Sequence, residues 1–324
     1  MTNINISFGN RLAALTHGLR CGFAPLLVML LLGSVVDCFG IGKSQTAHAK
    51  VAFTDSQGAV LIADAITGLP TPLALGKQLA QPLGICVGSD GEFFVTDTGC
   101  CALIGIDPTT GDQRIVSSGG ILGVPFGIAA EPRGSLLVAN AQNLLRIDAQ
   151  SGAQTVLSAG GFFRAPLAVA VAPSGDIYVA DALGSIIRVD PETGTQTFVA
   201  GAGFLKRPQG IAVVGKHLYV TDVATADGNF GIGRIIRVDK QNGQQKVLSE
   251  GNYLVGPVGI AAGEVGELIV GDPYTINENS PDLFDGGIIR IDQVTGAQSL
   301  IARGQGDFLN PRCVTVIQSS VAGQ

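Results

Sequence analysis

The chain of 324 residues contains no tryptophan, three histidines and six cysteines, and only 14% of its residues are charged. It carries 20 basic against 26 acidic residues, so it lacks the basic surface that neutralises phosphates, and we expect no nucleic-acid partner. The motifs of serine hydrolases, zinc sites and phosphate-binding loops are absent. With 46 glycines and 15 prolines, the chain falls within the usual range for one large all-β domain.

Residues 1–49 differ in composition from the rest of the chain. Arg11 and Arg20 precede an apolar run at residues 23–36, and residues 47–49 form a small-x-small cleavage site. The run is shorter than the roughly 20 residues that span a membrane, so we expect a cleaved export signal, with an uncleaved anchor as the alternative. The sequence thus predicts a periplasmic or extracellular protein without stable membrane insertion after cleavage. Loss of this segment makes the net charge more negative than the −6 of the whole chain.

Four cysteines follow the predicted signal: Cys86, Cys100, Cys101 and Cys313. In an exported protein an even number permits disulfides, but four cysteines allow three full pairings, and their spacing matches no metal or redox motif. Cys86 and Cys313 occupy equivalent positions of a repeat, which favours burial as small hydrophobic residues. Cys38 would suit a lipoprotein, but Asp37 stands where lipoprotein signals carry a small residue.

The stretch from Pro166 to Gly194 is the unit that the rest of the chain repeats. Three alternating apolar runs, at residues 166–171, 176–181 and 185–190, are separated by Gly and Asp turn signals, and Gln196–Val199 supplies a fourth. Short runs rich in β-branched residues and bounded by turn residues are typical of strands. The turn at residues 190–194 has Pro where φ is preset and Gly where a positive φ is needed. The unit is therefore predicted to be a four-stranded antiparallel meander.

The repeat begins at six prolines spaced 41 to 54 residues apart: Pro82, Pro125, Pro166, Pro208, Pro257 and Pro311. A period of this length with four short strands is typical of a propeller blade. After Pro311 only one strand remains, whereas the region from residue 51 opens in the middle of a repeat. We therefore predict an all-β, six-bladed propeller over residues 50–324, closed by N-terminal strands plus one C-terminal strand, which leaves no free sheet edge.

The recurring P-x-G-I-x-V, Y-V-x-D and I-x-R-[VI]-D-x-x-T-G elements resemble the NHL repeats of bacterial six-bladed propellers, over residues 51–319. Related propellers include gluconolactonase-like enzymes and streptogramin lyases, in which the resemblance implies a metal site at the central opening. The gluconolactonase-like family places an Asn at the start of a first strand. The corresponding positions here are Leu83, Phe126, Leu167, Gln209, Val258 and Arg312, and none is Asn. The lyases use a catalytic His, but His217 lies in a first-to-second strand turn, so neither constellation transfers.

Two loops set one face of the predicted disc apart. Arg188 follows Asp181 by seven positions, whereas Arg237 follows Asp222 by 15 positions and Arg290 follows Asp272 by 18. In a repeat fold, insertions clustered on one face often form its binding surface. Oxygen ligands suitable for Ca²⁺ occur in these loops, without the spacing of a known calcium loop: Asp227, Asn229, Asn277, Glu278, Asp282 and Asp285. A solvated acidic loop without a partner is the alternative.

Several recurrent residues favour structural roles. The Asp that ends each second strand, at positions 55, 97, 181, 222 and 272, is expected to cap turns, and Asn140 replaces it once. Arg146, Arg188, Arg237 and Arg290 are expected to pair with acidic neighbours across strands. An apolar pair before the blade starts, as in Phe162-Phe163, favours packing between blades over a sugar-binding platform.

From these patterns we predict an exported module that binds or scaffolds a protein or glycan partner on the loop-rich face. The predicted binding residues are Phe126, Asn140, Gln209, Asp227, Asn229, Asp272, Asn277, Glu278, Asp282, Asp285 and Arg312. No catalytic residue and no cofactor is predicted. The one ion considered is Ca²⁺, bound by the long loops. The alternative is a metal-dependent hydrolase or lyase of the gluconolactonase-like or streptogramin lyase type.

Overall fold

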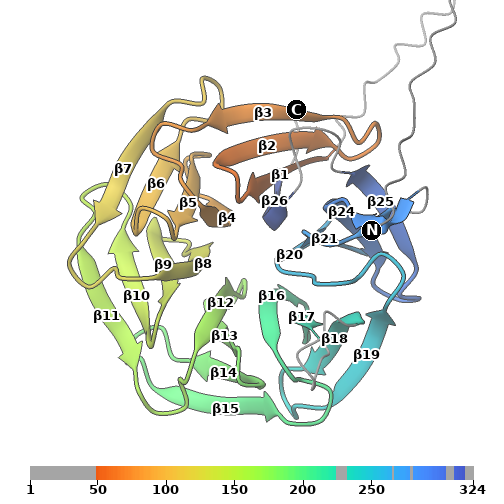
Figure 1. The fold of residues 1–324 in the computed structure, drawn as a ribbon. Coiled ribbons are helices and arrows are strands. Elements are labelled where there is room, and N and C mark those ends of the chain that lie inside the picture. Colours follow the sequence, from red (N-terminus) through yellow and green to blue (C-terminus); the bar gives the residue numbers. More distant parts are fainter. Residues whose placement is uncertain (1–48, 224–231, 265, 278–279, 304–309, 318–324) are drawn as a thin grey trace, which may run out of the picture. The chain divides into compact units, whose positions relative to one another are not determined.

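The computed structural model describes residues 49–223, 232–264, 266–277, 280–303 and 310–317, with the side chains of residues 276–284 left out of the description. The strands belong to one compact unit, Thr46–Gln324. Six four-stranded antiparallel sheets form the blades of a ring, as the sequence predicted (Figure 1). Within the described ranges, no helix is long and apolar enough to cross a membrane. The predicted signal at residues 1–49 lies almost wholly outside them.

The blades are numbered in chain order, and the strands of each are given from the innermost to the outermost. Blade 1 contains β26 (Pro311–Ile317), β1 (Lys50–Asp55), β2 (Ala59–Asp64) and β3 (Pro70–Leu75). Blade 2 contains β4 (Pro82–Val87), β5 (Phe93–Asp97), β6 (Ala102–Ile106) and β7 (Gln113–Ser118). Blade 3 contains β8 (Pro125–Ala130), β9 (Ser135–Asn140), β10 (Asn143–Asp148) and β11 (Gln154–Ala159).

The second half of the ring follows the same plan. Blade 4 contains β12 (Pro166–Val171), β13 (Ile177–Asp181), β14 (Ser185–Val189) and β15 (Gln196–Gly201). Blade 5 contains β16 (Pro208–Val214), β17 (His217–Val223), β18 (Gly233–Asp239) and β19 (Gln245–Glu250). Blade 6 contains β20 (Ile260–Ala262), β21 (Glu267–Asp272), β24 (Gly287–Asp292) and β25 (Gln298–Arg303), and its long loop carries the hairpin β22 (Ile276–Asn277) and β23 (Ser280–Phe284).

Ring closure joins the two ends of the propeller. The innermost strand of blade 1 is the C-terminal β26, which pairs antiparallel with β1 through Val316 opposite Val51. In Figure 1 the dark blue β26 lies beside the orange β1 at the centre of the ring. The predicted closure is confirmed. One predicted blade start differs, because the regular ladder of β20 begins at Ile260 and not at Pro257. Just before it, the Gly259 amide donates to the Arg312 carbonyl of the adjacent blade.

The glycine of the P-x-G-I repeat is explained by close packing of the inner strands. A Cβ on Gly84 would lie 2.6 Å from the Phe126 carbonyl oxygen, and one on Gly210 would lie 2.3 Å from that of Val258. Threonines of second strands bind the same carbonyls, since Thr96 Oγ1 donates to Phe126 and Thr221 Oγ1 donates to Val258 at 2.7 Å. This arrangement leaves the residue between Pro and Gly to line the axis of the ring.

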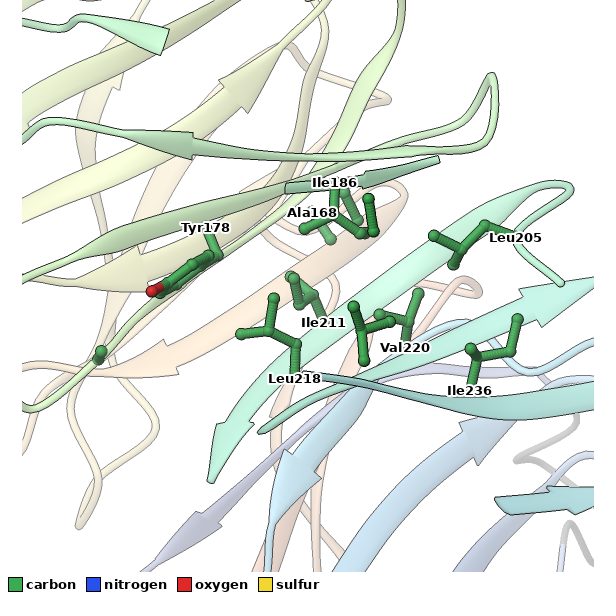
Figure 2. Packing of buried hydrophobic residues seen from close by; sticks show 12 residues of the cluster. Ala168, Tyr178, Ile186, Leu205, Ile211, Leu218, Val220 and Ile236 are labelled. Carbon is green, nitrogen blue, oxygen red and sulfur yellow. The ribbon is translucent and has the colours of Figure 1, made fainter. Parts of the chain in front are cut away.

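The hydrophobic core lies between adjacent blades and not in one central mass. The described residues form six buried apolar clusters, each made of side chains from two neighbouring blades. Figure 2 shows one of them, in which Tyr178 and Ile186 of blade 4 face Ile211 and Leu218 of blade 5. Leu205, the second residue of an apolar pair, is only 2% exposed in this cluster. Alternation along the strands thus buries both faces of every blade.

The other apolar pairs that precede blade starts are Ile121-Leu122, Phe162-Phe163, Tyr253-Leu254 and Phe308-Leu309. Leu122, Phe163 and Leu254 are buried, which confirms packing between blades. Their partners Ile121 and Phe162 stay exposed, as does Phe204, the partner of Leu205. Phe308-Leu309 lies outside the described residues.

The recurrent arginines mostly pair as predicted. Arg146 binds Glu131, Arg188 binds Asp176 and Arg290 lies 3.2 Å from Glu267. For Arg237 the prediction was wrong, because it forms no ion pair with any described residue. His217 takes the place that Asp176 has in blade 4. Burial and the nearby Arg237 and Lys216 charges lower the pKa of His217, so its imidazole is uncharged at neutral pH. It therefore does not provide Arg237 with the negative charge that Asp176 provides for Arg188.

Candidate binding face

The upper face comprises the loops that lead into the first strands and those that leave the second strands, because strand direction alternates within a blade. The lower face holds the D-x-x-T-G turns, and these are nearly identical. In one of them Asp107 accepts hydrogen bonds from the Thr109 and Thr110 amides, which lowers the pKa of its carboxyl. Such repetition serves the ring itself. The long loops that belong to single blades are found on the upper face.

Buried carboxylates hold the upper loops in place. Asp97 accepts from the Ala80 and Gln81 amides of the preceding loop and from the Gly99 and Cys100 amides of the following turn. In four other blades the equivalent carboxylate accepts a hydrogen bond from a backbone amide of the loop before the first strand: Asp55, Asp181, Asp222 and Asp272. The predicted turn capping is therefore confirmed.

Asn140 and Asp272, two of the predicted binding residues, have structural roles here. Asn140 Oδ1 accepts from the Gly123 and Val124 amides, while its Nδ2 donates to the Ile121 carbonyl and to Asn143. Asp272 is 0% exposed. Its carboxylate accepts hydrogen bonds from the Val255 amide, in the loop before the first strand, and from the Tyr274 amide, in the loop after the second strand. Burial raises the pKa of its carboxyl to about 6, against the effect of those hydrogen bonds. Burial likewise raises the pKa of Asp222. Neither Asn140 nor Asp272 presents a free polar group to a ligand.

A cavity of about 320 Å³ lies on the ring axis, among the six innermost strands that surround the centre in Figure 1. Its wall contains the first residues of these strands, so it lies toward the upper face. The residue after each proline contributes in turn around the ring: Arg312, Leu83, Phe126, Leu167, Gln209 and Val258. The structure thus brings together Phe126, Gln209 and Arg312, three predicted binding residues that are far apart in the sequence.

The wall of this cavity is mostly apolar, and its polar side chains lie on one side. Gln209 and Arg312 flank Val258, whereas Leu83, Phe126 and Leu167 are consecutive on the other side of the ring. Gln209 Nε2 donates to the Arg207 carbonyl at 3.2 Å. The Arg312 guanidinium has neither a hydrogen bond nor an ion pair with the residues that the structure describes. No carboxylate is among the described residues that line the cavity.

A second hollow continues from the cavity across the upper face. It has a volume of about 380 Å³ and shares Leu83, Phe126 and Arg312 with the first. Its other walls come from the upper loops and include Ser56, Thr98 and Val124. Val124 is 42% exposed, so an apolar surface extends outward from the opening. No sequence pattern predicts this second hollow, because it arises from loops of three different blades.

The long loops are only partly described. Asp227, Asn229 and Glu278 lie outside the described residues. Asn277 and Asp282 belong to the β22–β23 hairpin, but their side chains are not described. Asp285 is described, and its backbone amide donates to the Thr275 carbonyl at 3.1 Å. Their predicted binding role stays a prediction.

The described part of the chain holds no group of three or more His, Cys, Asp or Glu side chains that could bind a metal ion. The residues at the opening do not fit the divalent cation that the propeller enzymes place there. Apolar side chains are not ligands for such an ion, and the positive Arg312 repels it. His217 lies at the start of β17, on the lower face, beside Tyr219 at a ring-centroid distance of 6.2 Å. No step of a metal-dependent lactonase or lyase reaction can be assigned to these residues.

The four described cysteines are all free thiols. Cys86 is buried, as predicted from its place on a first strand, and burial raises its pKa to about 12. Cys313, for which the same burial was predicted, is only partly buried because it lines the central cavity, and desolvation raises its pKa likewise to about 12. Both thiols therefore stay protonated at neutral pH. Cys100 and Cys101 lie in an upper turn of blade 2, where Cys100 is exposed.

A comparison with protein-family models gave no match, and a search of curated proteins also found none. Among solved structures, 1225 chains match. One, from the crystal structure of a nidogen/laminin complex, matches with a TM-score of 0.67 and 15% sequence identity, over 83% of this chain and 98% of that chain. At this identity the likeness shows the propeller fold alone. Because the fold serves many functions, function must be argued from the upper face itself.

Proposed function

We propose that this chain is an exported propeller that binds a protein partner through its upper face. The observation that carries the proposal is the central cavity, whose apolar wall includes an arginine without a partner among the described residues. Exposed apolar side chains occur on the same face, at Val124, Leu183 and Ile232. Apolar surface around a few polar groups is typical of a contact surface. The long loops of blades 5 and 6 would contribute to it.

The fold is consistent with this role. The similar solved chain comes from a complex of nidogen and laminin. A rigid ring with capped loops also suits binding, because preorganised loops lose little conformational entropy when a partner docks. A metal-dependent reaction is less well supported, since the described residues at the opening offer no ligand set for a divalent ion.

Site-specific photocrosslinking in the producing cells tests the proposal. A photoreactive residue is placed at Val124 or Leu183 on the upper face, and at Val294 on the lower face as a control. All three side chains are exposed, at 42%, 70% and 84%. We expect one protein to be captured from both upper positions and not from Val294. Equal capture from both faces, or none from the upper face, would contradict the proposal.

Export is tested separately. The apolar run at residues 23–36 and the cleavage site at residues 47–49 predict that the mature chain begins near residue 50 and fractionates outside the cytoplasm. N-terminal sequencing of the purified chain and cell fractionation measure both. A chain that keeps residues 1–49 and stays in the cytoplasm would exclude export.

A further inference from the structure

Arg312 is the one charged side chain among the described residues that line the central cavity. Its guanidinium remains positively charged at any physiological pH. The neighbouring Cys313 thiol cannot neutralise it, since burial raises that pKa to about 12. A half-buried charge beside apolar side chains is unfavourable unless an opposite charge pairs with it. The cavity therefore presents a positive charge that no described carboxylate neutralises.

The geometry of the ring adds a second requirement for the ligand. Arg312 places hydrogen-bond donors on one side of the axis, while Leu83, Phe126 and Leu167 form an apolar side. Gln209 also lies on the polar side, but its Nε2 already donates to the Arg207 and Pro208 carbonyls. A ligand that matches both sides carries an anionic group next to an apolar group. The volume of about 320 Å³ suits a small ligand or one or two side chains of a partner. A planar carboxylate matches the two parallel donors of a guanidinium.

Exposed cations on two described loops favour the same kind of ligand. Arg164, Lys206 and Arg207 are exposed just before the first strands of blades 4 and 5. On the described part of the upper face, the acidic side chains outside the buried caps are those of Glu250 and Asp285. Cations around an opening raise the local concentration of anions and speed their association.

We propose that the central cavity binds a carboxylate attached to an apolar group, with Arg312 binding the carboxylate and Phe126, Leu83 and Leu167 packing against the apolar group. The inference rests on the proposed function of the upper face. The carboxylate is either the acidic side chain or C-terminus of the protein partner, or a free small molecule. Both sources share the chemistry that the cavity recognises.

In the test, the full chain is titrated with 4-phenylbutyrate and, separately, with its neutral amide, and binding is measured by isothermal titration calorimetry. The variant is Arg312→Gln, and Arg133→Gln is the matched control, because Arg133 is exposed in the lower-face turn between β8 and β9 and does not line the cavity. We expect the acid to bind Arg133→Gln as tightly as it binds the wild type, and to bind Arg312→Gln on the order of tenfold or more weakly. The neutral amide should bind the wild type about as weakly as the acid binds Arg312→Gln. Equal binding of acid and amide, or unchanged binding by Arg312→Gln, would overturn the proposal.

Two further arms keep the outcome interpretable. Phe126→Ala should weaken acid binding while leaving Arg312 in place, and the melting temperature of each variant shows whether the ring still closes. Capped Phe-Asp and Phe-Asn dipeptides then distinguish the sources, because a polypeptide ligand predicts that Phe-Asp competes with 4-phenylbutyrate and Phe-Asn does not. If the acid does not bind through Arg312 but crosslinking still captures a partner, only this inference fails. If the acid binds through Arg312 but no partner is captured, only the proposed function fails.

Discussion

Gln154 of β11 donates a hydrogen bond to Ser117 Oγ of β7 at 2.9 Å, across the boundary between blades 3 and 2. The same glutamine accepts the Ile121 and Leu122 amides of the loop that joins the two blades. Gln196 with Ser158 and Gln298 with Ser249 repeat the contact at other boundaries. One side chain thus fixes the outer strand and the upper loop of the neighbouring blade.

We therefore expect Gln154→Ala to lower the free energy of unfolding by about 1–3 kcal/mol, because it leaves backbone amides without an acceptor. Denaturant unfolding measures the loss. Gln150→Ala is the matched control, since Gln150 is exposed and only its backbone amide is hydrogen-bonded. A similar loss in both variants would show that the contact between the blades contributes nothing.

Gly194→Ala should be much more harmful than Gly175→Ala. Both glycines have a positive φ, +70° and +88°, so alanine strains the backbone at each by about 1–2 kcal/mol. Only at Gly194 does a Cβ collide with a neighbouring blade, 1.9 Å from the Leu157 carbonyl oxygen. We expect Gly194→Ala to lose several kcal/mol more than Gly175→Ala in thermal or denaturant unfolding. Equal losses would mean that blades 3 and 4 do not approach so closely.

Asp272 should make the propeller less stable as the pH rises. Because burial raises the pKa of its carboxyl to about 6, its contribution is fully present below the ordinary pKa near 4 and is lost as the pH rises through 6. Relative to Asp272→Asn, the wild type should lose up to about 3 kcal/mol of unfolding free energy between pH 4 and pH 7. Unfolding curves of both chains at each pH measure the difference.

Asp107→Asn is the control for this pH dependence. Hydrogen bonds from the Thr110 and Thr109 amides lower the pKa of the exposed Asp107 carboxyl. Its stabilising effect is therefore present above the unfolded pKa and is lost as the pH falls, which is the opposite direction. A wild-type profile parallel to that of Asp272→Asn would show that the Asp272 carboxylate is not desolvated.

His217→Asp should stabilise blade 5. It restores the acidic residue that Asp176 provides for Arg188 in blade 4, where the two side chains lie 2.5 Å apart. For a partly exposed pair we expect a gain of about 0.2–1 kcal/mol that declines with added salt. A double-mutant cycle with Arg237→Gln isolates the pair. A gain that persists without Arg237 would assign the effect to the loss of the imidazole instead.

Removal of divalent ions should leave the melting temperature of the full chain nearly unchanged. The positive Arg312 and the apolar wall of the cavity do not favour a cation at the opening. Melting is measured with EDTA and again after Ca²⁺, Mg²⁺ or Zn²⁺ is added back. A large, reversible and ion-specific rise would reveal a site bound only by the native state. That result would support the metal-dependent alternative and direct attention to the long loops.

Local patterns explain why the strands were predictable. In the unit after Pro166, the predicted and observed strands agree to within a few residues at their ends. Alternation and turn chemistry act over a few neighbouring residues, so one sequence window contains the whole signal. The contact of Gln154 with Ser117 was not predicted, because its partners are 37 residues apart and polar residues at strand ends are common. The isolated position of Arg237 was not predicted, because its recurrence suggested an acidic partner that the described residues of blade 5 do not provide.

The repeat, the number of blades and the strand that closes the ring could all be predicted from the sequence, because each depends on periodic residues along the chain. The sequence also placed Phe126, Gln209 and Arg312 at equivalent positions of their repeats. Only the tertiary structure decided that these side chains share one cavity of about 320 Å³ and that Arg312 has no carboxylate partner among its described neighbours. Distance across the ring axis and the pairing of charges depend on how six separate blades close around it, and no local pattern contains that information.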